Sequence, residues 1–213
     1  MKTLTTISIL VILITTQLFS QFRLGVTASV GKNFTSQESI MLSNLDNVVN
    51  YELEHMYQTP TTAFGLALLY TQDLIWIQSR PSITTTSHEY MLDDHTNRSL
   101  NQLSDKQVSV TLPIVAGTYI KEILRVGAGP VFQKALEAGD AFLNMPSFTM
   151  EEKKLIDTGF LFVLGTDFFD RFFLDAIFTQ GLNKTGEEYA YMGRGVKYKG
   201  RTRTLGLALS VYL

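Results

Sequence analysis

The chain has 213 residues, which is enough for one domain, and 45% of them are apolar, so it can bury or present a sizeable apolar surface. Its 18 Lys and Arg nearly balance 20 Asp and Glu, which argues against the basic surface that nucleic-acid binding requires. Because the chain contains no cysteine, disulfides, thiolate metal sites, iron–sulfur clusters and cysteine nucleophiles are excluded.

The amino terminus has the order of a secretory signal peptide. A positively charged start precedes the apolar run Ile7–Ile14, and a more polar segment then closes on the small residue Ser20. The apolar run is too short to cross ~30 Å of hydrocarbon, which argues against a membrane anchor. We therefore expect cleavage before Gln21, so that residues 1–20 are a signal peptide and residues 21–213 form the mature domain.

Alternating segments follow one another through the rest of the chain. In the first of them, every second residue from Phe22 is apolar and the residues between are small or polar, which is typical of a strand with one apolar face. Leu74–Ile77 is apolar on both faces, so its register is left unassigned. Pro113 removes a ladder donor, and we expect a bulge there. The predicted strands are Phe22–Gly31, Ala63–Thr71, Leu74–Thr86, Gln107–Ile120, Leu124–Gln133, Thr158–Phe169, Phe172–Gly181 and Arg203–Leu213.

The connections between these strands alternate in length. Long polar connections are expected near 32–60, 87–106, 134–157 and 182–200, with short turns between the other strand pairs. No mature segment approaches eighteen uninterrupted apolar residues, so a membrane-spanning form must be a closed barrel. The pattern predicts an all-β fold: an eight-stranded antiparallel up-and-down transmembrane β-barrel with short periplasmic turns, long extracellular loops and both mature termini on the periplasmic rim.

Aromatic residues near the short turns or the termini suggest a lipid-facing barrel. We expect them to form an interfacial girdle, because aromatic rings collect where lipid meets water. The alternative, that they fill a soluble core, is disfavoured by the small residues opposite them. The expected girdle residues are Phe22, Tyr70, Trp76, Tyr119, Phe168, Phe172 and Tyr212.

Four charged residues have inward parity near the periplasmic ends of their strands, namely Arg23, Arg125, Asp167 and Asp175. A narrow lumen hydrates charges poorly, so these side chains are expected to pair. A structural plug is the favoured interpretation, and a proton or substrate relay is the alternative.

Several motifs occur in one order along the predicted strands: Val110–Ile114, Val126–Pro130, Asp157–Gly165 and Phe172–Asn183. This series resembles the PorT-like outer-membrane β-barrel family, whose strands carry a Leu-x-Pro element, a Gly-Pro element, a mid-strand glycine and a Tyr-x-x-Gly-Leu-x-Asn segment. Phe178 stands where the family usually has tyrosine, and the chain ends in Tyr212-Leu213 rather than phenylalanine. The resemblance covers essentially the whole mature chain and implies, for some members, a link to type IX secretion.

The chain lacks the sequence signatures of common enzymes and cofactor sites. His55, His88 and His95 fall in the expected long loops, where solvated residues are favoured over a metal site. The pair Ser87-His88 leaves a lipid-modifying hydrolase as a distant alternative. Neither a catalytic residue, a metal nor a cofactor is predicted.

The fourth long connection and its exit are rich in lysine and arginine. A basic solvated loop is favoured there, with contact to outer-leaflet lipid phosphates as the alternative. The basic residues are Lys184, Arg194, Lys197, Lys199, Arg201 and Arg203.

These patterns together predict a non-enzymatic integral outer-membrane protein. Its role would be structural, adhesive or secretion-accessory, exercised through the extracellular loops, with outer-membrane lipid and envelope or secretion proteins as partners. The rival hypothesis is a soluble periplasmic or secreted lipocalin-like barrel that binds a small apolar ligand.

Overall fold

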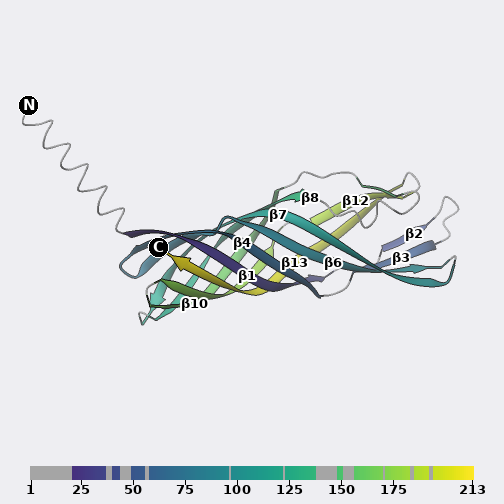
Figure 1. Cartoon of the computed structure of the whole chain (residues 1–213). Helices are drawn as coiled ribbons and strands as arrows, with labels where there is room; N and C mark the ends of the chain where they lie inside the picture. Colours follow the sequence, from purple (N-terminus) through teal and green to yellow (C-terminus); the bar gives the residue numbers. More distant parts are fainter. Residues whose placement is uncertain are drawn as a thin grey trace, which may run out of the picture.

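The chain folds into a closed antiparallel β-barrel with a projection at one end (Figure 1). The computed structural model describes residues 21–36, 40–43, 49–55, 58–95, 97–121, 123–137, 148–150, 156–169, 171–182, 185–191 and 194–213. The expected signal peptide, residues 1–20, lies outside the described residues.

Eight wall positions form the barrel, and each wall strand pairs with the next in an antiparallel register. The last strand pairs with the first, with Val26 opposite Val211, and this closes the wall. The predicted eight-stranded antiparallel barrel is confirmed. In order around the wall, the strands are β1 (Phe22–Ser36), β4 (Gln58–Gln72), the pair β5 (Ile75–Ser79) and β6 (Ser82–Asp94), β7 (Ser99–Ile120), β8 (Leu124–Glu137), β10 (Ile156–Phe168), β11 (Phe172–Gly181) and β13 (Arg194–Tyr212).

The third wall position consists of β5 and β6, separated by Arg80 and Pro81. Ser79 lies opposite Ile114 and Ser82 lies opposite Thr111, so both strands advance by three residues and the register continues across the gap. The interruption therefore inserts no residue into the wall. It removes ladder hydrogen bonds, since proline has no N–H to donate.

The bulge expected at Pro113 is absent, and that prediction is wrong. Pro113 pairs with Val131 in the register that also pairs Ala116 with Ala128. Proline removes a donor without adding a residue, and the neighbouring strand is interrupted beside it. The Ser79 hydroxyl donates to the Pro113 carbonyl at 2.9 Å. The irregularity in this strand pair lies instead between Val108 and Ser109.

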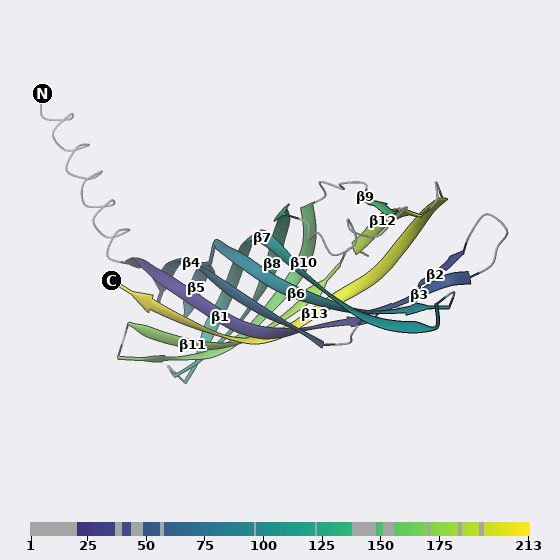
Figure 2. The ribbon, with the colours of Figure 1, turned by 45° about the vertical axis from the view of Figure 1, so that its right-hand side comes forward.

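The expected long loops are largely strands that continue past the barrel. The segment 87–106 is a hairpin in which β6 and β7 stay paired as far as Asp94 and Ser99, with Arg98 at a φ of 51° in its turn. Figure 2 shows this hairpin leaving the barrel at the end opposite the carboxyl terminus. The expectation of loops in these segments is corrected: polar residues interrupt the alternation outside the barrel, although the strands stay paired and β6 still buries Tyr90 and Leu92 there. The added strands are β2 (Ile40–Ser43), β3 (Val49–His55), β9 (Phe148–Met150) and β12 (Thr185–Tyr191).

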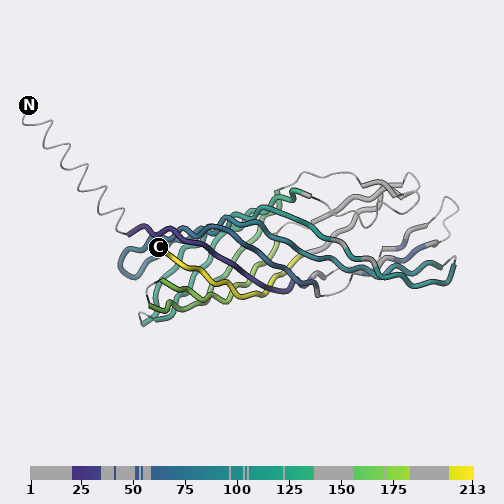
Figure 3. The backbone as a smooth tube through the Cα atoms, in the orientation of Figure 1, coloured from purple at the N-terminus to yellow at the C-terminus, as the bar shows by residue number. Residues whose placement is uncertain are grey.

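Two rims of the barrel differ in their connections. The short-turn rim carries the turns near residues 73–74, 121–123 and 169–171, together with the start of β1 and the end of β13. The Leu213 N–H donates to the Leu24 carbonyl there at 2.9 Å. The opposite, projecting rim carries the extended hairpins, and the smooth trace in Figure 3 shows the wall strands passing into it. The start of β1 and the carboxyl terminus therefore lie on the same, short-turn rim, as expected from the long first connection.

The outward face of the wall is a band of exposed apolar side chains. Its members are 36% to 67% exposed, although large apolar side chains in a water-soluble protein are mostly covered. They alternate with inward residues along every wall strand, which confirms the face assignments made from the sequence. This apolar band includes Val26, Val30, Phe64, Leu66, Ile77, Ile83, Val110, Leu112, Ile114, Val126, Phe132, Phe160, Phe162, Leu164, Leu174, Phe178, Leu205, Leu207 and Leu209. Within the described residues, no helix is long and apolar enough to span a membrane.

Candidate functional site: an ion network in the barrel lumen

The lumen contains a buried carboxylate held by two guanidinium groups. Asp175 comes from β11, Arg125 from β8, and Arg80 from the gap between β5 and β6. The Arg125 Nη2 group donates to both carboxylate oxygens of Asp175, at 2.6 and 2.8 Å. The Arg80 Nη1 group donates to Asp175 Oδ2 at 2.9 Å. All three residues are at most 5% exposed, so these contacts offset part of the hydration that the buried charges lose.

Two aromatic rings hold the guanidinium of Arg125. Its Cζ atom lies 4.9 Å from the centre of the Trp76 ring and 4.3 Å from the centre of the Phe173 ring. Both distances are within the range of a cation–π contact, which is strongest where water is excluded. The Nε and Nη1 groups of Arg125 have no hydrogen-bond partner among the described residues. The two ring faces are therefore the stabilising neighbours of that part of the cation.

A second polar group joins this cluster from β5 and β13. The Gln78 side-chain amide donates to the hydroxyl of Tyr212, and the Tyr212 ring meets Phe173 edge to face at 4.8 Å. Farther along β13, the Ser210 hydroxyl donates to that of Thr27, which donates in turn to the Leu209 carbonyl. We call Trp76, Gln78, Arg80, Arg125, Phe173, Asp175 and Tyr212 the lumen network.

Glycines on neighbouring strands make room for the largest members of the network. A Cβ atom added at Gly127 would lie 2.4 Å from the Trp76 ring, and one added at Gly117 would also lie 2.4 Å from it. A Cβ atom at Gly165 would lie within 1.9 Å of an Asp175 carboxylate oxygen. No side chain fits at these distances. The small inward residues seen in the sequence are therefore the space into which the indole and the carboxylate fit.

The structure brings together two of the four predicted lumen charges. Arg125 and Asp175 form the centre of the network. Arg23 and Asp167 also face inward, but they lie nearer the short-turn rim and are only partly buried. Asp175 takes Arg80, rather than Arg23, as its second ion-pair partner within the described residues.

Sequence reasoning missed Arg80, Gln78 and Phe173. The first two belong to the strand whose register could not be assigned, because its start is apolar on both faces. The glycines at 117 and 127 were a usable signal for the register of this strand, because they leave a hole that a large side chain such as Trp76 can fill. Phe173 alternates with Phe172 and Leu174 and has the same inward parity as Asp175.

The predicted aromatic girdle is partly wrong. Phe22, Phe168 and Phe172 are exposed on the outward face near the short-turn rim, and Tyr70 is partly buried with its hydroxyl 3.1 Å from Gln72 Oε1. Three other members face the lumen instead: Trp76 and Tyr212 are buried in the network, and Tyr119 packs against the apolar part of the lumen core. The physical reason is that nearness to a turn fixes a residue's height on the wall, whereas strand parity fixes its face.

The three histidines do not meet in one place. The His88 Nε2 atom is 3.2 Å from Gln107 Oε1, and its ring stacks on Tyr90. The exposed His95 lies 3.9 Å from Glu52. His55 pairs through its backbone with Tyr90. Within the described part of the chain, no group of three or more acidic or histidine side chains could hold a metal ion.

Comparison with known proteins identifies relatives of the fold. No family model matches the chain, and no curated protein matches its sequence. The crystal structure of the outer membrane protein OprG from Pseudomonas aeruginosa is similar, with a TM-score of 0.52 and 11% identity over 90% of this chain and 96% of OprG. The similarity shows that the chain has the fold of a small outer-membrane β-barrel.

Two further solved structures match with lower scores. The outer membrane protein AlkL in lipid bilayers has a TM-score of 0.46 and 12% identity over 89% of this chain and 90% of AlkL. The attachment invasion locus protein Ail of Yersinia pestis has a TM-score of 0.40 and 11% identity over 89% of this chain and 99% of Ail.

Proposed function

We propose that this chain is a non-enzymatic integral protein of a bacterial outer membrane that acts through its projecting rim. The apolar band supports the membrane location. Exposed aliphatic and aromatic side chains encircle the wall, and a closed barrel leaves no unpaired strand edge in lipid. The short-turn rim would then face the periplasm and the projecting rim the exterior.

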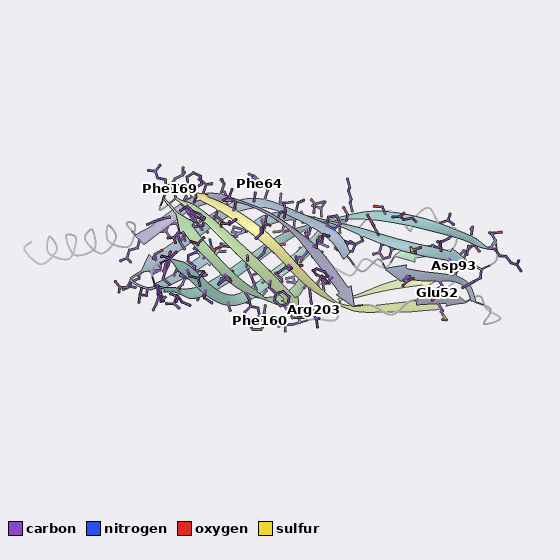
Figure 4. All side chains as sticks on the ribbon, turned by 90° about the horizontal axis from the view of Figure 1, so that it is seen from below. Glu52, Phe64, Asp93, Phe160, Phe169 and Arg203 are labelled. Atoms are coloured by element: carbon purple, nitrogen blue, oxygen red, sulfur yellow. The ribbon has the colours of Figure 1, made fainter. Side chains whose placement is uncertain are left out.

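The observation that carries the proposed role is the length of the β6–β7 hairpin. Its wall part ends near Ile83 and Val110, yet the strands remain paired for eleven further residues, from Thr84 to Asp94. Strands β2 and β3 add to the same sheet through pairing of β3 with β6. Figure 4 shows Glu52 and Asp93 at the far end of this projection, well removed from Phe169 at the other end.

The lumen supports a role at the surface rather than one inside the barrel. An eight-stranded barrel is about wide enough to be filled by its own side chains. The lumen network and the apolar residues packed with it, including Leu69, Val115 and Leu161, are buried. A lipocalin-like carrier would place its apolar face inward around a ligand. In this barrel the band of apolar side chains faces outward, which does not fit the soluble rival.

We also infer that the chain is PorT-like. The four ordered motifs support this, since each falls on a single wall strand or its immediate end: Val110–Ile114 on β7, Val126–Pro130 on β8, Asp157–Gly165 on β10 and Phe172–Asn183 on β11. The resemblance makes a secretion-accessory role one of the three surface roles to test, beside a structural and an adhesive one.

The experiment compares the full chain with a variant in which residues 88–105 are replaced by a two-residue turn. Both proteins should fractionate with the outer membrane, need detergent for extraction and run faster on gels before boiling. Amino-terminal sequencing of the mature protein should begin at Gln21. In a host deleted for the gene, the full chain should restore surface adhesion, envelope integrity or cargo export, and the shortened variant should not. Purification of the full chain without detergent would contradict the membrane location, and equal complementation would contradict the role of the hairpin.

A further inference from the structure

A ring of polar positions interrupts the outward apolar side chains toward the projecting rim. Each wall strand has one such polar residue, and exposed apolar side chains recur two residues beyond it on β8, on β10 and just past β11, at Leu136, Ile156 and Leu182. In order around the wall these residues are Lys32, Thr62, Thr85, Lys106, Lys134, Thr158, Gln180 and Arg203. Four are basic, three are threonines, one is glutamine and none is acidic, although the whole chain has slightly more acidic than basic residues. This ring therefore has a local excess of positive charge.

Two of these cations lie close together across the seam where the barrel closes. Lys32 on β1 is opposite Leu205, and Arg203 on β13 is opposite Phe34, so Lys32 and Arg203 are diagonal neighbours on adjacent strands. Both are exposed on the outward face. Diagonal neighbours are roughly 7–8 Å apart at their backbones, which lets long side chains reach one common group.

A neighbouring amide orients the arginine of this pair. Gln180 on β11 lies directly opposite Arg203, and its side-chain oxygen accepts a hydrogen bond from Arg203 Nε at 2.9 Å. That bond uses the Nε donor, which is on the stem side of the guanidinium. The planar end of the group carries the remaining N–H donors, arranged as a fork that suits two oxygens of one anion.

The floor beneath the three polar side chains is apolar. Two residues toward the short-turn rim from Lys32, Gln180 and Arg203 are Val30, Phe178 and Leu205, which are exposed members of the apolar band. Figure 4 shows Arg203 between the barrel residue Phe160 and the distal Glu52 and Asp93, where the barrel gives way to the projection. A molecule complementary to this surface has an acyl chain that packs against Val30 and Leu205 and an anionic group nearer the projecting rim, beside Lys32 and Arg203.

The short-turn rim lacks this excess of positive charge. By sequence, its short turns contain three acidic and two basic residues, which sum to one net negative charge. An anionic lipid should therefore be attracted more strongly to the polar ring near the projecting rim than to the short turns. The asymmetry matches a membrane whose outer leaflet carries the phosphorylated lipid.

We infer that Lys32 and Arg203, with Arg203 oriented by Gln180, form a binding site for the phosphate of a phosphorylated glycolipid in the outer leaflet. The acyl chains of the lipid pack on Val30, Phe178 and Leu205. This inference rests on the proposed membrane location, and it assigns to the wall a lipid-binding role separate from that of the projecting hairpin.

The test begins with insertion into phosphatidylcholine vesicles, read by the gel shift of unboiled protein. Failure of the wild type to insert would overturn the membrane location and this site with it. Inserted protein is then transferred to neutral detergent and titrated with fluorescent lipid A that carries two phosphates. The wild type should bind it roughly 30-fold more tightly than the Lys32→Gln/Arg203→Gln variant, since each of the two surface cations near an anionic lipid contributes about 1 kcal/mol.

The matched control is Lys121→Gln/Arg171→Gln, which removes the same charge from exposed positions on the short-turn rim. It should bind lipid A within about twofold of the wild type, because exposed charges act over about a Debye length only. The same glycolipid without phosphates should bind wild type and both variants equally. Equal binding of lipid A by the wild type and the Lys32→Gln/Arg203→Gln variant would overturn the site. An equal loss in both variants would show a response to net charge and would overturn it as well.

Discussion

At the scale of single residues, Asp175 is the group on which the lumen depends. It is fully buried and pairs with two guanidinium groups. One carboxylate against two cations leaves the network with one net positive charge, and the ring faces of Trp76 and Phe173 stabilise the Arg125 cation. Parity in the sequence predicted that Arg23, Arg125, Asp167 and Asp175 pair with one another, without indicating which pairs form. It could not predict Arg80, because that residue lies beside a proline in an interrupted strand.

Removing the carboxylate should destabilise the barrel strongly. Asp175→Asn keeps the shape of the side chain but leaves Arg80 and Arg125 buried without a counter-charge. The loss in free energy of unfolding should be about 3–5 kcal/mol, the usual cost of breaking a buried ion pair from one side. Urea unfolding of the folded protein in vesicles measures it. Asp167→Asn, the same change at a partly buried inward position, is the control, and an equally large effect there would contradict the central role of Asp175.

The contact between glycine and indole gives a second prediction at this scale. Gly127→Ala puts a methyl group where the Trp76 ring lies, and overpacking of this kind should cost roughly 1–3 kcal/mol. Trp76→Leu removes the clashing ring atoms, so the double variant should be less destabilised than the sum of the two single changes. A double-mutant cycle from urea unfolding gives the coupling. Strict additivity would mean that Trp76 does not pack against this glycine.

At the scale of elements, alternation predicted the faces of the wall strands but failed in two places. It left the register of the third strand open, since Leu74–Ile77 is apolar throughout while only Trp76 among these four residues is buried. The inward position of that ring depends on the glycines of β7 and β8, which are distant in the sequence. Alternation also became irregular beyond the wall, because polar residues interrupt it on β6 and β7 even where Tyr90 and Leu92 are buried, and the paired extension therefore looked like a loop.

The depth of a residue on β13 should control its tolerance of charge. Leu207 is 53% exposed on the outward face and lies four residues from Arg203. Leu207→Arg should cost about 2–4 kcal/mol, as arginine does at the midplane of a lipid-facing barrel. Leu205→Arg, only two residues from Arg203, should cost less, because the cost falls toward the interface. Folding titrations into vesicles measure the free-energy cost of both substitutions. Equal costs would mean that positions 205 and 207 do not lie at different depths in the lipid.

At the scale of the whole molecule, the barrel and the projection are two structurally distinct parts. The barrel provides a lipid-facing wall and a lumen filled by an ion network, aromatic rings and apolar side chains. The wall strands then carry a paired sheet beyond the apolar band. Because the same strands form both parts, the position of the projection is fixed by the barrel rather than by a flexible linker.

The filled lumen predicts that the barrel does not conduct ions steadily. Arg80 and Asp175 join opposite parts of the wall, and Arg125, Trp76, Phe173 and Tyr212 surround them, so a hydrated ion would have to displace these buried groups. Planar-bilayer recordings should show no steady open level after insertion has been verified by the gel shift of unboiled protein. Trp76→Ala/Phe173→Ala removes both rings and leaves the ion pair in place, and it should show brief openings where the wild type shows none. Large, steady conductance from the wild type would contradict the closed lumen, because ions would then be crossing the layer that Asp175 holds together.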